Sequence, residues 1–180
     1  MHKAKGFFIQ SILIIHMERT RTIHWHDPMA GAAKAMQMSG LDYIQAMGDG
    51  QIPVPPIVNT LDLKLVSAER GQAIFSFEPQ EFHYNPIGTV HGGVITAILD
   101  SAMGCTLHTT LPVGTGYTTL ELKVNFLKAI TIKTGVLRAV GKIINAGSRT
   151  ALVEAQLLDS NDKLYAHSVS TCMILKQESI

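Results

Sequence analysis

The sequence is poor in cysteine, in charge of either sign and in long apolar runs. It has two cysteines, Cys105 and Cys172, far apart and without a Cys-x-x-Cys spacing, so neither a zinc site nor a disulfide scaffold is expected. This cysteine content is typical of a reducing compartment, and we expect a cytoplasmic protein. Fifteen Lys and Arg residues oppose fourteen Asp and Glu residues without a basic block, so we expect no nucleic-acid partner.

An apolar run near the N-terminus, residues 7–15, is too short to cross a membrane. Lys3 and Lys5 before this run imitate a secretory signal, but no small-residue cleavage site follows it directly. Met17 begins an ordinary polar stretch and offers a second start. We therefore interpret residues 1–16 as an extension outside the domain, with export as the alternative, and we expect no membrane partner.

Apolar side chains, in contrast, are abundant. Hydrophobic residues make up 46% of the 180 residues and charged residues 16%, which is enough to bury one core in a chain too short for two ordinary domains. We expect three segments. These are an N-terminal extension over residues 1–27, a helical and Pro-rich lead-in over residues 28–56, and one domain over residues 57–176.

The lead-in is rich in Ala, Met and Gln, which predicts two short helices over residues 28–48 with a break at Gly40. The prolines between residues 53 and 56 predict an extended entry to the domain, without regular structure. Methionines such as Met47 are suited to line a pocket, but in helices they more often fill gaps in a core, and we interpret them so.

The rest of the chain predicts one long helix and several strands. Alternating apolar and polar residues over 61–78 predict a hairpin, and the apolar stretch 94–111 predicts the helix. Because this helix is apolar nearly all round, it needs burial on most faces, so we predict an α+β fold with a mainly antiparallel sheet curled around it. Four further strands are predicted, over residues 117–129, 134–146, 149–159 and 163–175.

Two features of the long helix point to chemistry. Asp100 is a carboxylate among apolar side chains, which is unfavourable to bury without a partner or a role, although a capping or solvent-facing Asp is the alternative. At the start of the helix, Gly92 and Gly93 expose backbone N–H groups at the positive end of the helix dipole. These amides are suited to stabilise an oxyanion, although a tight turn that needs small residues would have the same sequence.

Distance separates these two features. Gly92 and Asp100 are eight residues apart, which is roughly 12 Å along a helix. One carbonyl group cannot contact both, so if Gly92 holds the oxygen while Asp100 attacks or activates water, the two residues come from different copies of the chain. We therefore predict a homodimer with two equivalent sites.

The sequence resembles a known family around these residues. Over about residues 40–175, the stretches FHYNPIGTVHGGVITAILDSAMG, GYTTLELKVNFLKA and LYAHSVSTCMIL are similar to the PaaI-type acyl-CoA thioesterases of the hotdog-fold superfamily. The resemblance implies a curved antiparallel sheet wrapped around one long central helix, here with an N-terminal helical extension. It also implies an active site shared across a dimer interface, and we expect the dimers to pair into a dimer of dimers.

The resemblance also implies roles for individual residues. Asp100 would be the catalytic carboxylate, Gly92 would supply the oxyanion amide, and Asn85 would help to orient the thioester or the water. His91 stands at the position of the family's motif histidine, which is credited with positioning more than with proton transfer. The choice between direct attack by Asp100 and general-base help stays open.

A threonine is implied as well. Thr119 falls near the Ser or Thr position that assists the nucleophilic water in some members of the family, with Thr118 as the alternative if the register slips by one. Regular alternation along this strand would place Thr119 on one face together with Glu121, Lys123 and Asn125.

Four further residues are candidates for contacting the substrate. Gly93 belongs to the same turn as the oxyanion amide. His83 lies next to the predicted site in sequence, with support of a loop as the alternative role. Lys128 and Arg149 are the cations that we expect to meet the phosphates of coenzyme A.

The predicted function is hydrolysis of an acyl- or aroyl-CoA thioester to the acid and free coenzyme A. We expect no cofactor, because coenzyme A is part of the substrate, and no metal site, because His24 and His26 are too few ligands for zinc. No GxSxG elbow surrounds Ser101 and no Cys-His signature surrounds Cys105, so a Ser or Cys nucleophile is not expected.

Two other functions stay open. A non-catalytic acyl-CoA-binding or sensor module would have the same fold, but the presence of both Asp100 and the glycine turn speaks against it. A hydratase or dehydratase acting on acyl thioesters is disfavoured because nothing in the sequence resembles the longer His-containing loops of such enzymes. Release of a thiol distinguishes hydrolysis from both.

Overall fold

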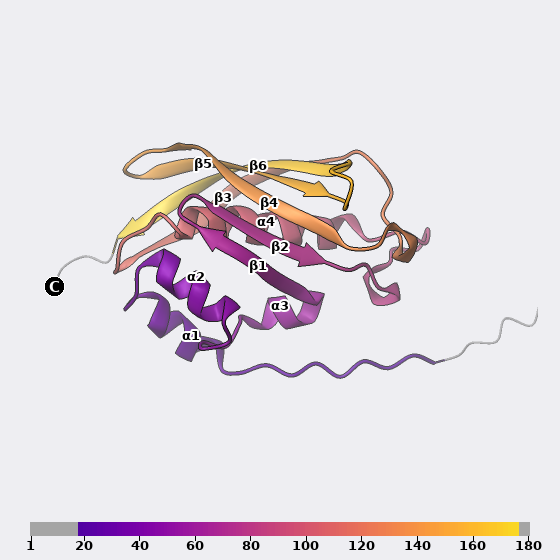
Figure 1. Cartoon of the computed structure of the whole chain (residues 1–180), viewed down its shortest axis with the longest axis horizontal. Coiled ribbons are helices and arrows are strands. Elements are labelled where there is room, and N and C mark those ends of the chain that lie inside the picture. Colours follow the sequence, from indigo (N-terminus) through magenta and orange to yellow (C-terminus); the bar gives the residue numbers. More distant parts are fainter. Residues whose placement is uncertain (1–17, 177–180) are drawn as a thin grey trace, which may run out of the picture.

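A computed structural model describes residues 18–176, and its centre is one long helix covered by a curved antiparallel sheet (Figure 1). The helix, α4, spans Gly92–His108 and packs against β2 to β6. The strands follow the order β1-β2-β4-β5-β6-β3, and all neighbours are antiparallel. The predicted α+β architecture is confirmed. The strand bounds are β1 Leu63–Glu69, β2 Gln72–Phe77, β3 Thr115–Phe126, β4 Leu137–Ala146, β5 Thr150–Leu158 and β6 Leu164–Lys176.

Helix α4 forms where predicted because apolar side chains occur on nearly every face of it, and the sheet buries them. Thr106 lies among these side chains, and its hydroxyl accepts a hydrogen bond from the backbone N–H of Ala73 at 3.0 Å, which satisfies a buried polar group. A β-carbon at Gly141 in β4 would overlap the Thr106 side chain, so glycine lets α4 lie close to the sheet. The fully buried α4 side chains include Ile98, Leu99, Ala102, Met103 and Leu107.

The lead-in forms three helices. Their bounds are α1 Pro28–Ala35, α2 Gly40–Gly48 and α3 Pro56–Leu61. The first two are the predicted pair, but the break spans residues 36–39 and Gly40 is the first residue of α2 rather than the break. Ser39 caps α2 by accepting a hydrogen bond from the N–H of Asp42 at 3.3 Å. The prediction that the prolines exclude regular structure is wrong at α3. Pro56 is the first helical residue there, a position where the missing N–H removes no intrahelical hydrogen bond.

Contacts with the rest of the chain fix α2 in place. A β-carbon at Gly40 would overlap the carbonyl of His108, so α2 begins against the end of α4. The Gly40 N–H donates to the carbonyl of Leu111 at 3.0 Å, and the Gln45 amide donates to the carbonyl of Ala68 in β1 at 3.0 Å. The predicted boundary at residue 57 falls inside α3, and the segment limits remain predictions. None of the helices within residues 18–176 is long and apolar enough to cross a membrane.

A β-bulge changes which residues of β3 face the helix. Thr119 pairs with Cys172 in β6 while Glu121 pairs with Thr171, so Leu120 is an extra residue in β3. The alternation therefore reverses at Leu120. Thr119 faces α4, whereas Glu121 and the exposed polar residues after it lie on the other face. The prediction that Thr119 shares a face with Glu121, Lys123 and Asn125 is wrong, because regular alternation does not continue through a bulge.

Burial also makes one histidine sensitive to pH. His108 is 8% exposed, and the centroid of its ring lies 5.5 Å from that of Tyr43 and 5.6 Å from that of Tyr117. Desolvation by burial lowers the pKa of His108 below its ordinary value. The unfolded chain therefore binds a proton at a higher pH than the folded chain does, so the free energy of unfolding falls as the pH drops below about 6.5.

We expect a His108→Gln variant to lose less stability on acidification than the wild type. The measurement is urea denaturation of both proteins at pH 7.5 and pH 5.5. The wild-type midpoint should fall by more than the variant midpoint. The variant lacks the His108 imidazole, whose protonation is disfavoured by burial in the folded state. Equal changes in the two midpoints would show that His108 makes no contribution to the pH dependence.

Candidate active site

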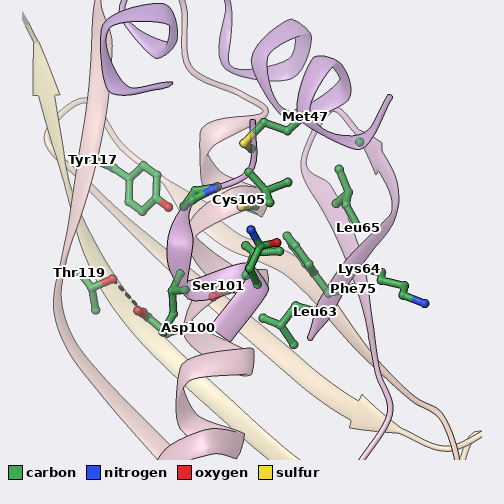
Figure 2. Close-up of a pocket in the computed structure, with 16 residues that line it drawn as sticks. Met47, Leu63, Lys64, Leu65, Phe75, Asp100, Ser101, Cys105, Tyr117 and Thr119 are labelled. Atoms are coloured by element: carbon green, nitrogen blue, oxygen red, sulfur yellow. Dashed lines mark hydrogen bonds between the residues drawn. The ribbon is translucent and has the colours of Figure 1, made fainter. Parts of the chain in front are cut away.

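A cavity of about 550 Å³ lies between α4, β1 and the lead-in helices α2 and α3. We call this space the Asp100 cavity. Figure 2 shows Asp100 and Thr119 on one side of it, with Leu65 and Phe75 across from them and Met47 at its end. Most of the remaining lining is apolar, so the space suits an apolar group placed next to a carboxylate. The further apolar lining residues are Val54, Pro55, Ile57, Val58 and Leu63.

Asp100 and Thr119 form the polar centre of the cavity. The Thr119 hydroxyl donates a hydrogen bond to Oδ1 of Asp100 at 2.9 Å (Figure 2). Thr118 is exposed on the opposite face of β3 and does not line the cavity. The hydroxyl of Ser101 donates to the carbonyl of Ala97 at 2.8 Å, one turn back along α4. The carboxylate is thus half-buried and oriented by one donor from the neighbouring strand.

Two further side chains line the cavity beside Asp100, and both stay neutral at physiological pH. Burial raises the pKa of the Cys105 thiol to about 12, with a smaller contribution from the nearby charge of Asp100. Burial likewise raises the pKa of Tyr117 well above its ordinary value. A neutral thiol is a poor nucleophile, so Cys105 does not offer this cavity a reactive thiolate.

A second space, the Gly92 hollow, lies at the N-terminus of α4 and has a volume of about 350 Å³. His91 caps the helix, because its Nδ1 accepts a hydrogen bond from the N–H of Gly93 at 2.9 Å. The N–H of Gly92 is the first of the helix and has no intrahelical acceptor. Phe126 and Lys128 line the hollow with Gly92. The Gly93 amide is thus used in the helix cap, whereas the Gly92 amide has no intrahelical acceptor and Gly92 lines the hollow.

Asn85 builds the loop that carries this turn. Its Oδ1 accepts hydrogen bonds from the N–H groups of Ile87 and Thr89, both at 3.1 Å, and its Nδ2 donates to the hydroxyl of Thr89 at 2.9 Å. Asn85 also lines the Gly92 hollow. Its side chain is thus largely used in closing the loop, and a contact with the thioester or water remains a prediction.

His83 supports the turn before Gly92 from within the core. It is 2% exposed and packs against Phe77 and Phe82, with ring centroids 4.8 and 4.1 Å away. Its Nδ1 accepts from the N–H of Gln80 at 3.0 Å, and its carbonyl accepts from the N–H of His91 at 2.8 Å. His83 lines neither space, so the structure matches the alternative of a loop-supporting residue. Desolvation lowers the pKa of His83, which keeps the ring neutral.

Arg149 lies apart from the other candidates. It is exposed at the turn between β4 and β5 and lines neither the Asp100 cavity nor the Gly92 hollow. Within one chain, the structure brings Asp100 together with Thr119, and Gly92 together with Asn85 and Lys128, in two separate spaces.

Sequence reasoning missed the contribution of the lead-in. Met47 is buried in a core cluster, as predicted, but it also lines the Asp100 cavity, as do Val58 and Asn59 of α3. Tyr117 was not singled out either. Its hydroxyl is packed so closely to Gly104 that a β-carbon there would overlap it. The methionine-rich composition was the one signal for this lining, and it does not separate a pocket from a core.

Comparisons with known proteins identify sequences that this chain is similar to. A sequence model of the thioesterase superfamily matches residues 87–166. A protein of Saccharolobus solfataricus named "Putative esterase" is 30% identical over 120 residues, which cover 67% of this chain and 84% of that protein. The 1,4-dihydroxy-2-naphthoyl-CoA hydrolase of Listeria monocytogenes is 26% identical over 118 residues, which cover 66% of this chain and 94% of the hydrolase.

Solved structures give the same result. A phenylacetic acid degradation-related protein from Ralstonia eutropha JMP134 superposes with a TM-score of 0.67 at 28% identity, over 73% of this chain and 98% of that one. The PaaI protein of E. coli has the same fold at 16% identity, with a TM-score of 0.66 over 77% of this chain and 96% of its own. The resemblance to PaaI-type proteins is confirmed, and the chain belongs to the thioesterase superfamily, with its hotdog fold.

Proposed function

We propose that this protein hydrolyses an acyl- or aroyl-CoA thioester to the free acid and coenzyme A, at a site that two copies of the chain build together. The observation that carries the proposal is the Asp100 carboxylate, held by Thr119 beside an apolar cavity. The cavity would take the acyl group, and the carboxylate would lie at the reacting carbonyl. The Listeria relative, named as a CoA hydrolase, acts on the same class of bond.

The chemistry needs a carboxylate and an oxyanion site. In one route Asp100 attacks the thioester carbonyl, which expels the coenzyme A thiolate and leaves an anhydride that water hydrolyses. In the other, Asp100 takes a proton from a water molecule that attacks the carbonyl directly. In both, the C–S bond breaks, a C–O bond to water oxygen forms, and the thiolate leaves with a proton from solvent. Coenzyme A is part of the substrate, and the proposal requires no further cofactor.

A second copy is needed because one chain keeps the two groups apart. Asp100 lies more than two helical turns beyond Gly92 on α4, roughly 12 Å along the axis. The two residues also line different spaces. A thioester carbonyl held by the Gly92 amide is therefore out of reach of Asp100 in the same chain.

Strand β3 offers the surface for such a pairing. It is an edge strand of the sheet, and its side chains Leu120 and Phe126 are 55% and 53% exposed. Thr119 in its first half lies beside Asp100, while Phe126 at its end lies beside Gly92, with 3.3 Å from Phe126 Cζ to a β-carbon built there. Antiparallel pairing of two copies of β3 would set the Gly92 end of each chain against the Asp100 end of the other.

Lys128 would contribute to binding of coenzyme A. It is exposed and lines the Gly92 hollow, the space in which the Gly92 amide would hold the thioester carbonyl. A cation there would attract a phosphate of coenzyme A. Arg149 lines neither space within one chain, and its contact with a phosphate of coenzyme A remains a prediction.

A thiol-release assay over a panel of acyl- and aroyl-CoA thioesters tests the function. We expect release of one thiol for each acid formed with at least one member of the panel. Tight binding of acyl-CoA without thiol release would replace the proposal by a sensor function. Addition of water to an unsaturated acyl-CoA without thiol release would replace it by a hydratase.

A further inference from the structure

The N-terminal arm, residues 18–27, precedes the stretch that matches the family and contains neither helix nor strand. It runs alongside α3, the short helix that forms one wall of the Asp100 cavity (Figure 1). Arg21 is the centre of this contact. Its side chain is 25% exposed, although it belongs to a segment that is otherwise mostly exposed.

Arg21 holds the end of α3 with several charge-assisted hydrogen bonds. Its Nη1 donates to the carbonyl of Thr60 at 2.7 Å, and its Nη2 donates to the carbonyl of Asn59 at 2.8 Å and to Oδ1 of Asp62 at 2.7 Å. The guanidinium also lies over the ring of Phe82, 3.9 Å from the centroid. The planar guanidinium thus adds donors to the last carbonyls of the helix, of which that of Asn59 also accepts a longer hydrogen bond from the N–H of Asp62 at 3.4 Å.

Asp62, which pairs with Arg21, has a backbone conformation that is unfavourable on its own. Asp62 ends α3 in the left-handed region, with a φ of 52°, which non-glycine residues adopt at a cost. The ion pair with Arg21 favours this conformation. A second contact adds to it, because Nδ2 of Asn59 donates to the carbonyl of His24 in the arm at 2.9 Å. The arm therefore fixes both the last turn of α3 and the residue that follows.

Helix α3 is one wall of the Asp100 cavity. Its residues Ile57, Val58 and Asn59 line the space. The arm bonds to Asn59 twice, because the Asn59 carbonyl accepts from Arg21 and the Asn59 side chain donates to the carbonyl of His24. With six residues, α3 is too short to be stable without tertiary contacts. The shape of this wall thus depends on contacts made outside the cavity, among them the two hydrogen bonds from Arg21 to the carbonyls of Asn59 and Thr60.

We propose that the N-terminal arm is a specificity element of the Asp100 cavity, in which Arg21 fixes α3 and so sets which acyl groups fit. The inference rests on the proposed function. Arg21 touches the wall and not the substrate, so it is a positioning residue. Without it, α3 shifts more freely, bound acyl groups lose close contact, and acyl groups of different length are distinguished less well.

The test compares Arg21→Ala and Arg21→Lys with a matched control, Arg138→Ala. Arg138 pairs with Asp162 at 2.6 Å, and Asp162 has a φ of 59°, so the control removes an Arg–Asp pair of the same kind at a site that does not line the cavity. Each protein is assayed for thiol release with straight-chain acyl-CoA thioesters from acetyl to dodecanoyl. Hydrogen exchange at the amides of residues 57–62 is measured in parallel.

For Arg21→Ala we expect KM for the preferred substrate to rise about tenfold with kcat within about twofold, and the preference among chain lengths to flatten. Exchange in α3 should become faster. Arg21→Lys should give values between those of the wild type and Arg21→Ala, because an ammonium can pair with Asp62 but cannot span the carbonyls of Asn59 and Thr60. If Arg21→Ala does not fold, Arg21→Lys provides the test. Arg138→Ala should match the wild type in every readout.

An unchanged KM and an unchanged chain-length profile in Arg21→Ala would overturn the inference, as would a uniform loss of kcat with the profile preserved. A wild-type protein that releases thiol from no member of the series would instead contradict the proposed function. The exchange measurement needs no substrate, so it reports separately whether Arg21 fixes α3.

Discussion

An Asp100→Asn variant is expected to lose acyl-CoA hydrolysis by a factor of about 10³ in kcat. Asparagine has nearly the same shape and still offers an oxygen to the Thr119 hydroxyl, which lies 2.9 Å from Oδ1 of Asp100. It has no negative charge, so it can neither attack the thioester carbonyl nor take a proton from water. Single-turnover and steady-state thiol release measure this change.

Two controls accompany the Asp100 prediction. The variant should keep the oligomeric state of the wild type by light scattering, and its stability should change little because the side chain is only half-buried. A Thr119→Val variant, which removes the donor but keeps the carboxylate, should lose about tenfold in kcat. Near-normal hydrolysis by Asp100→Asn would show that the carboxylate is not the reactive group.

A Gly92→Pro variant is expected to lose about 10² to 10³ in kcat, the usual effect of removing one oxyanion donor. Gly92 is the first residue of α4, and proline is favoured at that position because its fixed φ suits the helix. The substitution therefore deletes the N–H while it leaves the helix start in place. Because His91 accepts the N–H of Gly93, that neighbouring amide does not replace the missing donor.

Gly92→Ala is the matched control for this substitution. It keeps the N–H but adds the same β-carbon, which in both variants would lie 3.3 Å from Cζ of Phe126. Any effect of this tight contact is therefore common to both. A large loss in Gly92→Pro with a small loss in Gly92→Ala supports the oxyanion role. Equal kcat values in the two variants would contradict it.

The sequence predicts the parts of this structure that depend on local pattern. The apolar stretch around Asp100 forms helix α4, and the alternating stretches form the six strands, because burial and hydrogen bonding act on those patterns directly. The separation of Gly92 from Asp100 follows from helix geometry alone. Their division between two spaces in one chain agrees with that expectation.

Other parts depend on contacts between residues far apart in sequence, which no local pattern reveals. The bulge at Leu120 places Thr119 toward Asp100 and reverses the faces of the residues after it, and it is set by pairing with β6. Helix α3 forms although prolines precede it, and its last turn is contacted by Arg21, 38 residues before Asn59. Both features shape the Asp100 cavity, which is why its lining was the part least accessible from the sequence.

Mixing two inactive variants in one dimer tests the shared site most directly. Asp100→Asn and Gly92→Pro chains carry different affinity tags, are co-expressed, and the mixed dimers are purified through both tags. If each site takes Asp100 from one chain and Gly92 from the other, every mixed dimer has one intact site of two, and thiol release should recover to about half of the wild-type value. If one chain supplies both residues, no mixed dimer has an intact site, and activity that stays at the level of the parent variants would contradict the account.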